Sequence, residues 1–151
     1  MNVANHELEI LLAEDNEDDV ILVRESLEEV QIVSHVQVAR DGVEALEYVR
    51  ERAKEAAART RSLLVLLDIN MPRMNGFEVL SEMKSSPALK HIPVVMLTTS
   101  RREEDLVKSY RIGAASYITK PVNFEIFRDV VTRFALYWTT VSRIPPTRPR
   151  G

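Results

Sequence analysis

The stretch that decides the fold is residues 63–76, which read LLVLLDINMPRMNG. Five consecutive apolar residues, Leu63 to Leu67, are followed by one acidic residue, Asp68. A short apolar run that ends in turn residues is typical of a strand buried on both faces, as in a parallel sheet. The proline, asparagine and glycine later in the stretch predict a loop. Asp68 is therefore expected at the carboxyl edge of the sheet, where α/β folds place their chemistry.

The composition is that of an ordinary globular domain. With 151 residues, 45% of them hydrophobic and 28% charged, the chain is long enough for one domain with a real core. A net charge of −3 argues against a general nucleic-acid binder, and the lack of cysteine excludes disulfides, zinc–thiolate sites and thiol catalysis. The sequence shows neither a signal peptide nor an apolar run of the roughly 20 residues that a membrane span needs. A cytoplasmic protein is expected.

Short apolar runs alternate with longer amphipathic stretches along the chain. The expected strands are Leu8–Ala13, His35–Ala39, Leu63–Leu67, Ile92–Leu97 and Ala115–Thr119. The expected helix-start residues are Asn16, Asp41, Asn75, Ser100 and Asn123. The first four carry an acid three residues on, which is the spacing of a capping box. Gly113 is expected to end the fourth helix. Five strand–helix units in alternation predict an open α/β fold, a doubly wound five-stranded parallel sheet with helices on both faces.

Polar residues follow four of these strands, and a parallel sheet would gather them at one edge. They are Glu14, Asp15, Asp68, Thr98 and Lys120. Carboxylates that lie close together repel one another unless a cation neutralises them, and oxygen ligands suit Mg²⁺. A carboxylate can attack phosphorus to give an acyl phosphate, while a hydroxyl and a lysine could bind the phosphoryl oxygens. The three histidines, at positions 6, 35 and 91, are dispersed and are interpreted as surface or packing residues.

Each of these residues also has a purely structural interpretation. Glu14 and Asp15 could start a helix, Asp68 could form a turn, Thr98 could end a strand, and Lys120 could be a solvated charge. The joint occurrence of residues of the right kinds at four strand ends argues against coincidence.

Taken in order, the motifs resemble those of the response-regulator receiver domain, the CheY-like phosphoacceptor of bacterial two-component systems. The resemblance covers about residues 8–138 and is carried by residues 12–16 (LAEDN), residues 67–72 (LDINMP) with Asn75 and Gly76, Thr98, and residues 117–121 (YITKP). It implies a flavodoxin-like fold that is not an enzyme in the usual sense but assists its own phosphorylation and dephosphorylation. Family members often have Asp where this chain has Glu14.

The resemblance also implies roles for individual residues. Asp68 would accept a phosphoryl group from the phosphohistidine of a sensor kinase. Asp15, Asp68 and the main-chain carbonyl of Asn70 would hold Mg²⁺, and Glu14 would bind it directly or through water. Thr98 and Tyr117 would switch the surface formed by the fourth helix, fifth strand and fifth helix, and Lys120, with a cis bond to Pro121, would bridge to the phosphate. The side chains of Asn70 and Ser100 would tune hydrolysis.

The end of the chain suggests a regulator without an output domain. Residues 1–141 are expected to form the receiver with an extended last helix, and residues 142–151 a Pro/Arg-rich tail. An apolar 3-4 repeat with aromatics continues to the end of that helix and predicts a homodimer through Phe134, Tyr137, Trp138 and Val141. This helix, the tail and the insert-like stretch Glu51–Arg61 resemble the small regulators paired with bacterial phytochromes. Neither a nucleic acid nor a membrane is expected as a partner.

Two alternatives remain open from the sequence. A haloacid-dehalogenase-type phosphatase also uses an Asp nucleophile with Mg²⁺, Thr and Lys, but it needs a second Asp where this chain has Asn70, and its nucleophile follows the first strand. A pseudo-receiver would bind partners without taking phosphate, which the complete set of five polar residues disfavours.

Overall fold

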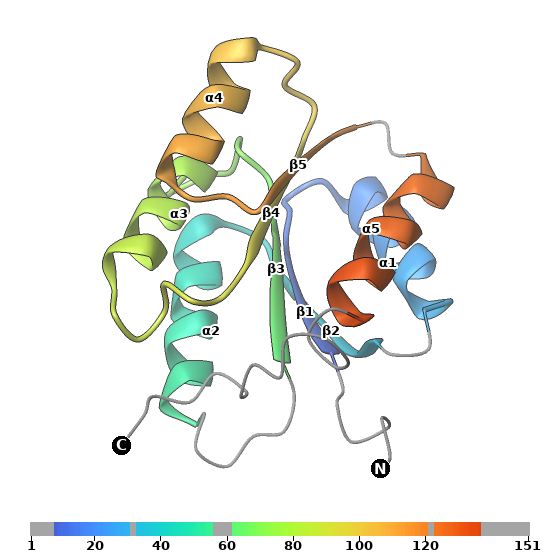
Figure 1. Ribbon diagram of the computed structural model, residues 1–151, viewed down its shortest axis with the longest axis horizontal. Coiled ribbons are helices and arrows are strands. Elements are labelled where there is room, and N and C mark those ends of the chain that lie inside the picture. Colours follow the sequence, from blue (N-terminus) through green and yellow to red (C-terminus); the bar gives the residue numbers. More distant parts are fainter. Residues whose placement is uncertain (1–7, 31–32, 56–61, 121–122, 137–151) are drawn as a thin grey trace.

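The computed structural model describes residues 8–30, 33–55, 62–120 and 123–136, in which five strands alternate with five helices (Figure 1). The elements are β1 (Leu8–Ala13), α1 (Glu17–Glu28), β2 (Val33–Ala39), α2 (Gly42–Lys54), β3 (Ser62–Leu67), α3 (Gly76–Ser85), β4 (Val94–Thr98), α4 (Glu103–Ile112), β5 (Ser116–Thr119) and α5 (Phe124–Leu136).

The strands form one parallel sheet in the order β2-β1-β3-β4-β5. Figure 1 shows α1 and α5 on one face of this sheet and α2, α3 and α4 on the other. The predicted doubly wound α/β fold is thereby confirmed. The strand order reverses between β1 and β3, and the carboxyl ends at such a point form the usual ligand crevice of open α/β sheets.

The two faces of the sheet are buried against separate apolar cores. Along β1, Leu11 and Ala13 pack toward α2 and α3, whereas Ile10 and Leu12 pack toward α1 and α5. All five residues from Leu63 to Leu67 are at most 1% exposed, which confirms that β3 is covered on both sides. Because β3 is fixed in this way, the residue that follows it has a well-defined position.

The strand limits differ from the predicted ones by at most two residues. β2 begins two residues earlier than expected, and β4 begins at Val94 rather than Ile92. Pro93 explains the late start of β4, because proline has no N–H to donate to a neighbouring strand. Its carbonyl still accepts from the N–H of Val65 at 3.1 Å.

Four of the five helix-start predictions are confirmed. The side chains of Asn16, Asp41, Asn75 and Asn123 each accept a hydrogen bond from a backbone N–H three residues on, at 2.8–3.1 Å. The capping-box spacing was less informative, because in the described residues the reciprocal bond forms only between Glu78 and the N–H of Asn75. The prediction for Ser100 was wrong.

The residue at the N-cap of α4 is Arg102, which makes no side-chain capping bond. Ser100 lies two residues earlier and donates from its hydroxyl to Asp105 at 2.6 Å. The other end of α4 is as predicted: the helix stops at Gly113, whose φ of 134° lies in a region that glycine adopts at low cost.

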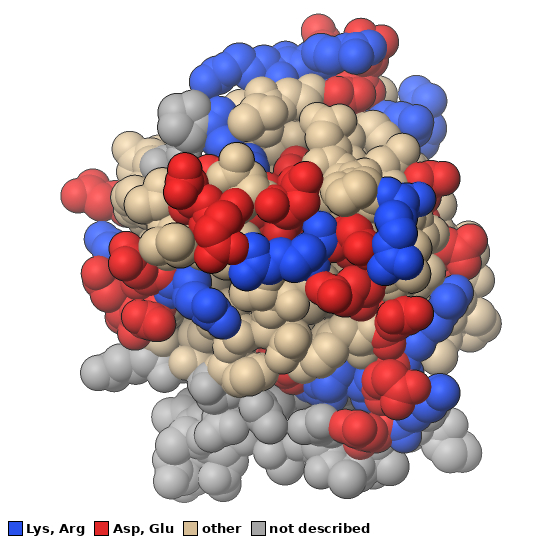
Figure 2. Space-filling view, turned by 180° about the vertical axis from the view of Figure 1, so that it is seen from behind, with Lys and Arg blue, Asp and Glu red and all other residues tan. Residues whose placement is uncertain are grey.

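Acidic and basic side chains are interspersed on the face of the molecule that Figure 2 shows. Several exposed groups are paired, among them Arg40 with Glu17, Arg50 with Glu82 and Arg102 with Glu104. Exposed pairs of this kind contribute little stability, so the cores account for most of it.

Within the described residues, no helix combines the length and the apolar character that crossing a bilayer requires. Some predictions fall outside the described residues: the Lys120–Pro121 bond, the tail, His6, the end of the Glu51–Arg61 stretch, and the dimer residues Tyr137, Trp138 and Val141. The same holds for the side chain of Phe134.

Candidate functional site

Three carboxylates meet at the carboxyl edge of the sheet, at the reversal of strand order. Glu14 follows β1 and Asp68 follows β3, and the pairing of Ala13 with Leu67 brings them next to each other. The N–H of Asp68 donates to the carbonyl of Ala13 at 3.1 Å, which fixes this arrangement. One oxygen each from Glu14, Asp15 and Asp68 lies within 4.8 Å of the others. The predicted acidic cluster is thus present, with Asp15 exposed and the other two buried.

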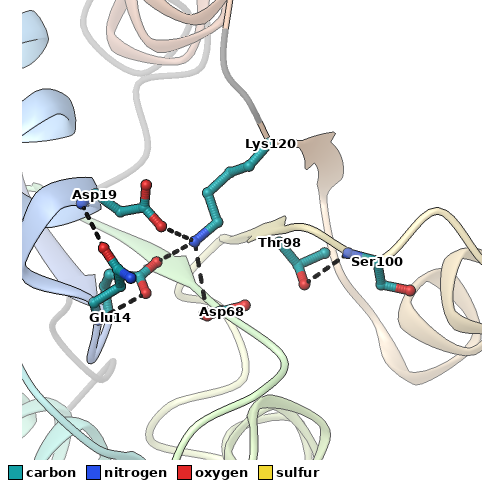
Figure 3. Close-up of polar contacts among 7 residues, drawn as sticks. Glu14, Asp19, Asp68, Thr98, Ser100 and Lys120 are labelled. Atoms are coloured by element: carbon teal, nitrogen blue, oxygen red, sulfur yellow. Dashed lines mark hydrogen bonds and ion pairs between the residues drawn. The ribbon is translucent and has the colours of Figure 1, made fainter.

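Lys120, which follows β5, reaches into this cluster (Figure 3). Its Nζ lies 2.6 Å from Oε1 of Glu14, 2.8 Å from Oδ2 of Asp19 and 3.8 Å from Oδ2 of Asp68. The ammonium therefore forms hydrogen bonds with Glu14 and Asp19, and it stands beyond hydrogen-bond length from Asp68.

The electrostatics of the cluster reflect burial and crowding of like charges. Burial raises the pKa of Glu14, the hydrogen bond from Lys120 partly offsets this, and the charge of Asp68 raises it further. Burial lowers the pKa of Lys120, but the hydrogen bonds to Asp19 and Glu14 outweigh this effect, so the pKa of Lys120 is raised. One ammonium therefore faces several carboxylates, and a further cation would relieve their repulsion.

The two residues predicted as a switch, Thr98 and Tyr117, both form a hydrogen bond with the backbone of Ser100. Thr98 ends β4 with its side chain buried, and its Oγ1 accepts from the N–H of Ser100 at 3.3 Å. Tyr117, on β5 and partly buried, donates from its hydroxyl to the carbonyl of Ser100 at 3.1 Å. Because the Ser100 hydroxyl donates to Asp105 on α4, Ser100 connects the ends of β4 and β5 to α4.

The loop after Asp68 depends on a close backbone approach at Gly76. The N–H of Gly76 donates to the carbonyl of Ile69 at 2.8 Å, and a Cβ at this position would lie 2.2 Å from the carbonyl oxygen of Asp68. Only glycine fits there, so Gly76 holds the start of α3 against the acceptor loop. Asn70, in the same loop, is exposed.

Sequence reasoning missed the role of Asp19. It was interpreted as a partner of the Asn16 cap, and its N–H does donate to Asn16, but its carboxylate binds Lys120. A contact across 101 positions has no local signal. The available hint was an acid on the first turn of α1, next to the strand end that carries Glu14.

A second missed feature is a buried polar cluster at the opposite end of β1. Glu9 is 2% exposed and Arg52 is 3% exposed; Arg52 donates from Nε to Glu9 at 2.6 Å, and Tyr48 also donates to Glu9. The signal was an acid inside an apolar strand together with Tyr48 and Arg52 four residues apart on one helix. This cluster lies outside the acidic site and joins α2 to β1.

The family model for the response regulator receiver domain matches residues 10–132. The chain belongs to this family. Response regulator Rcp1 from Synechocystis is 38% identical over 136 residues, which are 90% of this chain and 92% of Rcp1. The probable methanogenesis regulatory protein FilR2 from Methanothrix harundinacea is also 38% identical, over 90% of this chain and 86% of its own.

Solved structures agree with this assignment. The phosphorylated cyanobacterial phytochrome response regulator RcpA superposes with a TM-score of 0.72 at 39% identity, covering 91% of this chain and 96% of RcpA. The bacteriophytochrome response regulator AtBRR gives 0.70 at 41% identity, with coverage of 91% and 99%. The Mn²⁺-bound form of Rcp1 gives 0.69 at 37% identity, with coverage of 91% and 98%.

The receiver is the phosphoacceptor of two-component signalling and not an enzyme in the usual sense, and an acidic triad such as Glu14, Asp15 and Asp68 is typical of it. The phosphatase alternative fails because the central acid follows the third strand of a receiver fold.

Proposed function

We propose that this receiver takes a phosphoryl group on Asp68 from the phosphohistidine of a sensor histidine kinase. The observation that carries the proposal is the position of the Asp68 carboxylate, within 4.8 Å of two other acids and 3.8 Å from the Lys120 ammonium. A carboxylate oxygen of Asp68 attacks phosphorus, and the bond from phosphorus to the kinase imidazole breaks. The imidazole keeps the electron pair and takes up a proton, which leaves an acyl phosphate on Asp68.

The site residues fit a divalent cation, and we assign Mg²⁺. The donors are all oxygens; burial, and to a smaller extent the charge of Asp68, raises the pKa of Glu14, and a cation would relieve the repulsion between these carboxylates. Asp15, Asp68 and the main-chain carbonyl of Asn70 would hold the ion, with Glu14 binding directly or through water. When bound, the ion neutralises charge on the transferring phosphoryl oxygens. The binding of Mn²⁺ by Rcp1 supports a metal at this position.

The remaining residues act on the phosphoryl oxygens. Lys120 supplies a point charge and Thr98 a hydroxyl donor, in transfer and in the later hydrolysis that returns Asp68 to its free form. The side chains of Asn70 and Ser100 tune that hydrolysis. The Ser100 hydroxyl donates to Asp105 on α4, so it can act on the phosphoryl group only after this hydrogen bond breaks.

Phosphorylation changes the surface formed by α4, β5 and α5 through Ser100. When the Thr98 hydroxyl turns to the phosphoryl group, it gives up the N–H of Ser100, and Tyr117, bonded to the carbonyl of the same residue, repositions its ring. The added charge shifts an equilibrium that already exists in the free protein.

The relatives support a phytochrome kinase as donor, and the apolar repeat of the last helix is the basis for proposing a homodimer. RcpA and AtBRR are phytochrome response regulators, and this chain matches them over 91% of its length. We assign residues 1–141 to the receiver with its extended last helix, and residues 142–151 to a tail. Dimerisation would use Phe134, Tyr137, Trp138 and Val141.

The test is phosphotransfer from a bacteriophytochrome kinase autophosphorylated with radiolabelled ATP. We expect label to pass to the wild type with Mg²⁺ and not to Asp68→Asn, while Asp18→Asn, an exposed acid on α1, behaves as wild type. If acetyl phosphate modifies Asp68 but this kinase does not, the phytochrome assignment is wrong and the acceptor assignment stands.

A further inference from the structure

The Lys120 ammonium is hydrogen-bonded to Glu14 and Asp19, while Asp68, the proposed acceptor, lies beyond hydrogen-bond length from it. An ammonium has three N–H donors, and Glu14 and Asp19 accept at 2.6 and 2.8 Å, whereas Asp68 stands at 3.8 Å. Figure 3 shows the Lys120 nitrogen beside Glu14 and Asp19, with Asp68 below it. Two of the three N–H donors are therefore already taken, and an acyl phosphate on Asp68 would compete with Glu14 and Asp19 for the ammonium.

Of the two bonds that hold Lys120, the one to Asp19 costs less to break. The side chain of Glu14 is 2% exposed and would keep the N–H of Asn16 but lose its cationic partner in the core, whereas that of Asp19 is 31% exposed and can be hydrated again. Asp19 is also well placed to hold the lysine, because its N–H donates to the Asn16 cap at 3.0 Å and it lies on the first turn of α1.

We propose that Asp19 is a positioning residue that retains Lys120 in the unphosphorylated receiver and releases it to the phosphoryl group. The inference rests on the function proposed above. Retention by Asp19 lowers the fraction of molecules in which Lys120 is free to bind the phosphoryl oxygens. The apparent affinity for a phosphoryl group is reduced in proportion to that fraction. Asp19 therefore sets how readily the phosphorylated state forms.

The test uses beryllofluoride, which occupies the place of a phosphoryl group on a carboxylate, at a Mg²⁺ concentration high enough that further Mg²⁺ changes nothing. Asp19→Asn and Asp19→Ala should bind it about five- to tenfold more tightly than wild type, the order expected for losing one charge-assisted hydrogen bond. Asp18→Asn is the matched control, since it removes an equal charge from the same turn. It should change the affinity by less than about twofold.

A lysine variant separates retention from general charge. In a Lys120→Met background, Asp19→Asn should have no larger effect than Asp18→Asn, because the retained group is gone. A second readout is the ¹⁵N signal of the Lys120 ammonium without Mg²⁺, which should shift and exchange faster with water in Asp19→Asn and stay unchanged in Asp18→Asn.

Three results would overturn the inference. Equal affinities for the Asp19 and Asp18 variants would show that only net charge matters, and an unchanged Lys120 signal in Asp19→Asn would show that Asp19 does not hold the lysine. If wild-type protein binds no beryllofluoride while its circular dichroism is native, the proposed function itself is wrong and the inference falls with it.

Discussion

At the scale of single residues, the site depends on one lysine shared among three carboxylates. Lys120 is 6% exposed and contacts Glu14 and Asp19, with Asp68 slightly farther away. The carboxylates on different strand ends could be placed from the sequence, because parallel strands bring their carboxyl ends to one edge. The contact with Asp19 could not, since it depends on the rotamer of a long side chain reaching another element.

The variant Lys120→Met should separate phosphorylation from its consequence. We expect Asp68 still to accept phosphate from acetyl phosphate, at a rate reduced by about tenfold or more, because one charge that stabilises the phosphoryl oxygens is lost. Amide NMR shifts on α4 and β5 should change far less than in wild type. A wild-type pattern of shifts in phosphorylated Lys120→Met would contradict the role given to this lysine, and Lys54→Met, at an exposed site, serves as control.

At the scale of elements, short apolar runs predicted all five strands, and Asn or Asp caps predicted four of the five helix starts. These signals succeed because they are local: burial of a central strand requires an apolar run, and a helix start requires an acceptor. The start of α4 was misplaced because Asp105 binds the hydroxyl of Ser100 and the chain runs two further residues before the helix. The Glu9 cluster under α2 was missed because its partners lie about 40 residues apart.

Removing Arg52 should destabilise the link between α2 and β1. We expect Arg52→Met to lower the free energy of unfolding by about 3–5 kcal/mol, because it leaves the Glu9 carboxylate buried without its cationic partner, although Tyr48 still donates to it. The double variant Glu9→Leu with Arg52→Met should recover much of this loss. Urea unfolding of both variants, beside the exposed Arg50→Met, provides the measurement, and a double variant as unstable as Arg52→Met would refute the interpretation.

The same cluster predicts a pH dependence. Burial, and then the hydrogen bond to Glu9, raises the pKa of Tyr48 from 10.0 to about 12. The phenol is thus favoured in the folded state, so its contribution to stability is complete below pH 10 and is lost as the pH rises toward 12. We therefore expect the free energy of unfolding to fall more steeply between pH 10 and 11.5 in wild type than in Tyr48→Phe, as measured by urea unfolding at several pH values. A steeper fall in Tyr48→Phe would show that the sign of this pKa shift is wrong.

At the scale of the whole molecule, α4 is the most weakly anchored of the helices near the site. Its only buried residue among those described is Ser109, and its outer face exposes Leu106, Val107 and Tyr110. By contrast, α3 buries Val79, Leu80 and Met83. A helix with few buried contacts opens at low free energy and can respond to a change at Ser100.

Hydrogen exchange should reveal this difference. Without phosphate, we expect the backbone amides of α4 to exchange about tenfold or more faster than those of α3, and addition of beryllofluoride with Mg²⁺ should alter exchange in α4 and β5 while leaving α3 almost unchanged. Asp68→Asn provides the control. Equal protection of α3 and α4, with no response to beryllofluoride in wild type, would contradict a switch that acts through α4.

The most direct test of the central claim is the intact mass of the protein after incubation with acetyl phosphate, with and without Mg²⁺, for wild type beside Asp68→Asn and Asp18→Asn. We predict the mass of one added phosphoryl group on wild type and Asp18→Asn, dependent on Mg²⁺, and none on Asp68→Asn. An added group that persists in Asp68→Asn, or that forms equally well without a divalent cation, would contradict the assignment of Asp68 as the phosphoacceptor of a metal-assisted receiver.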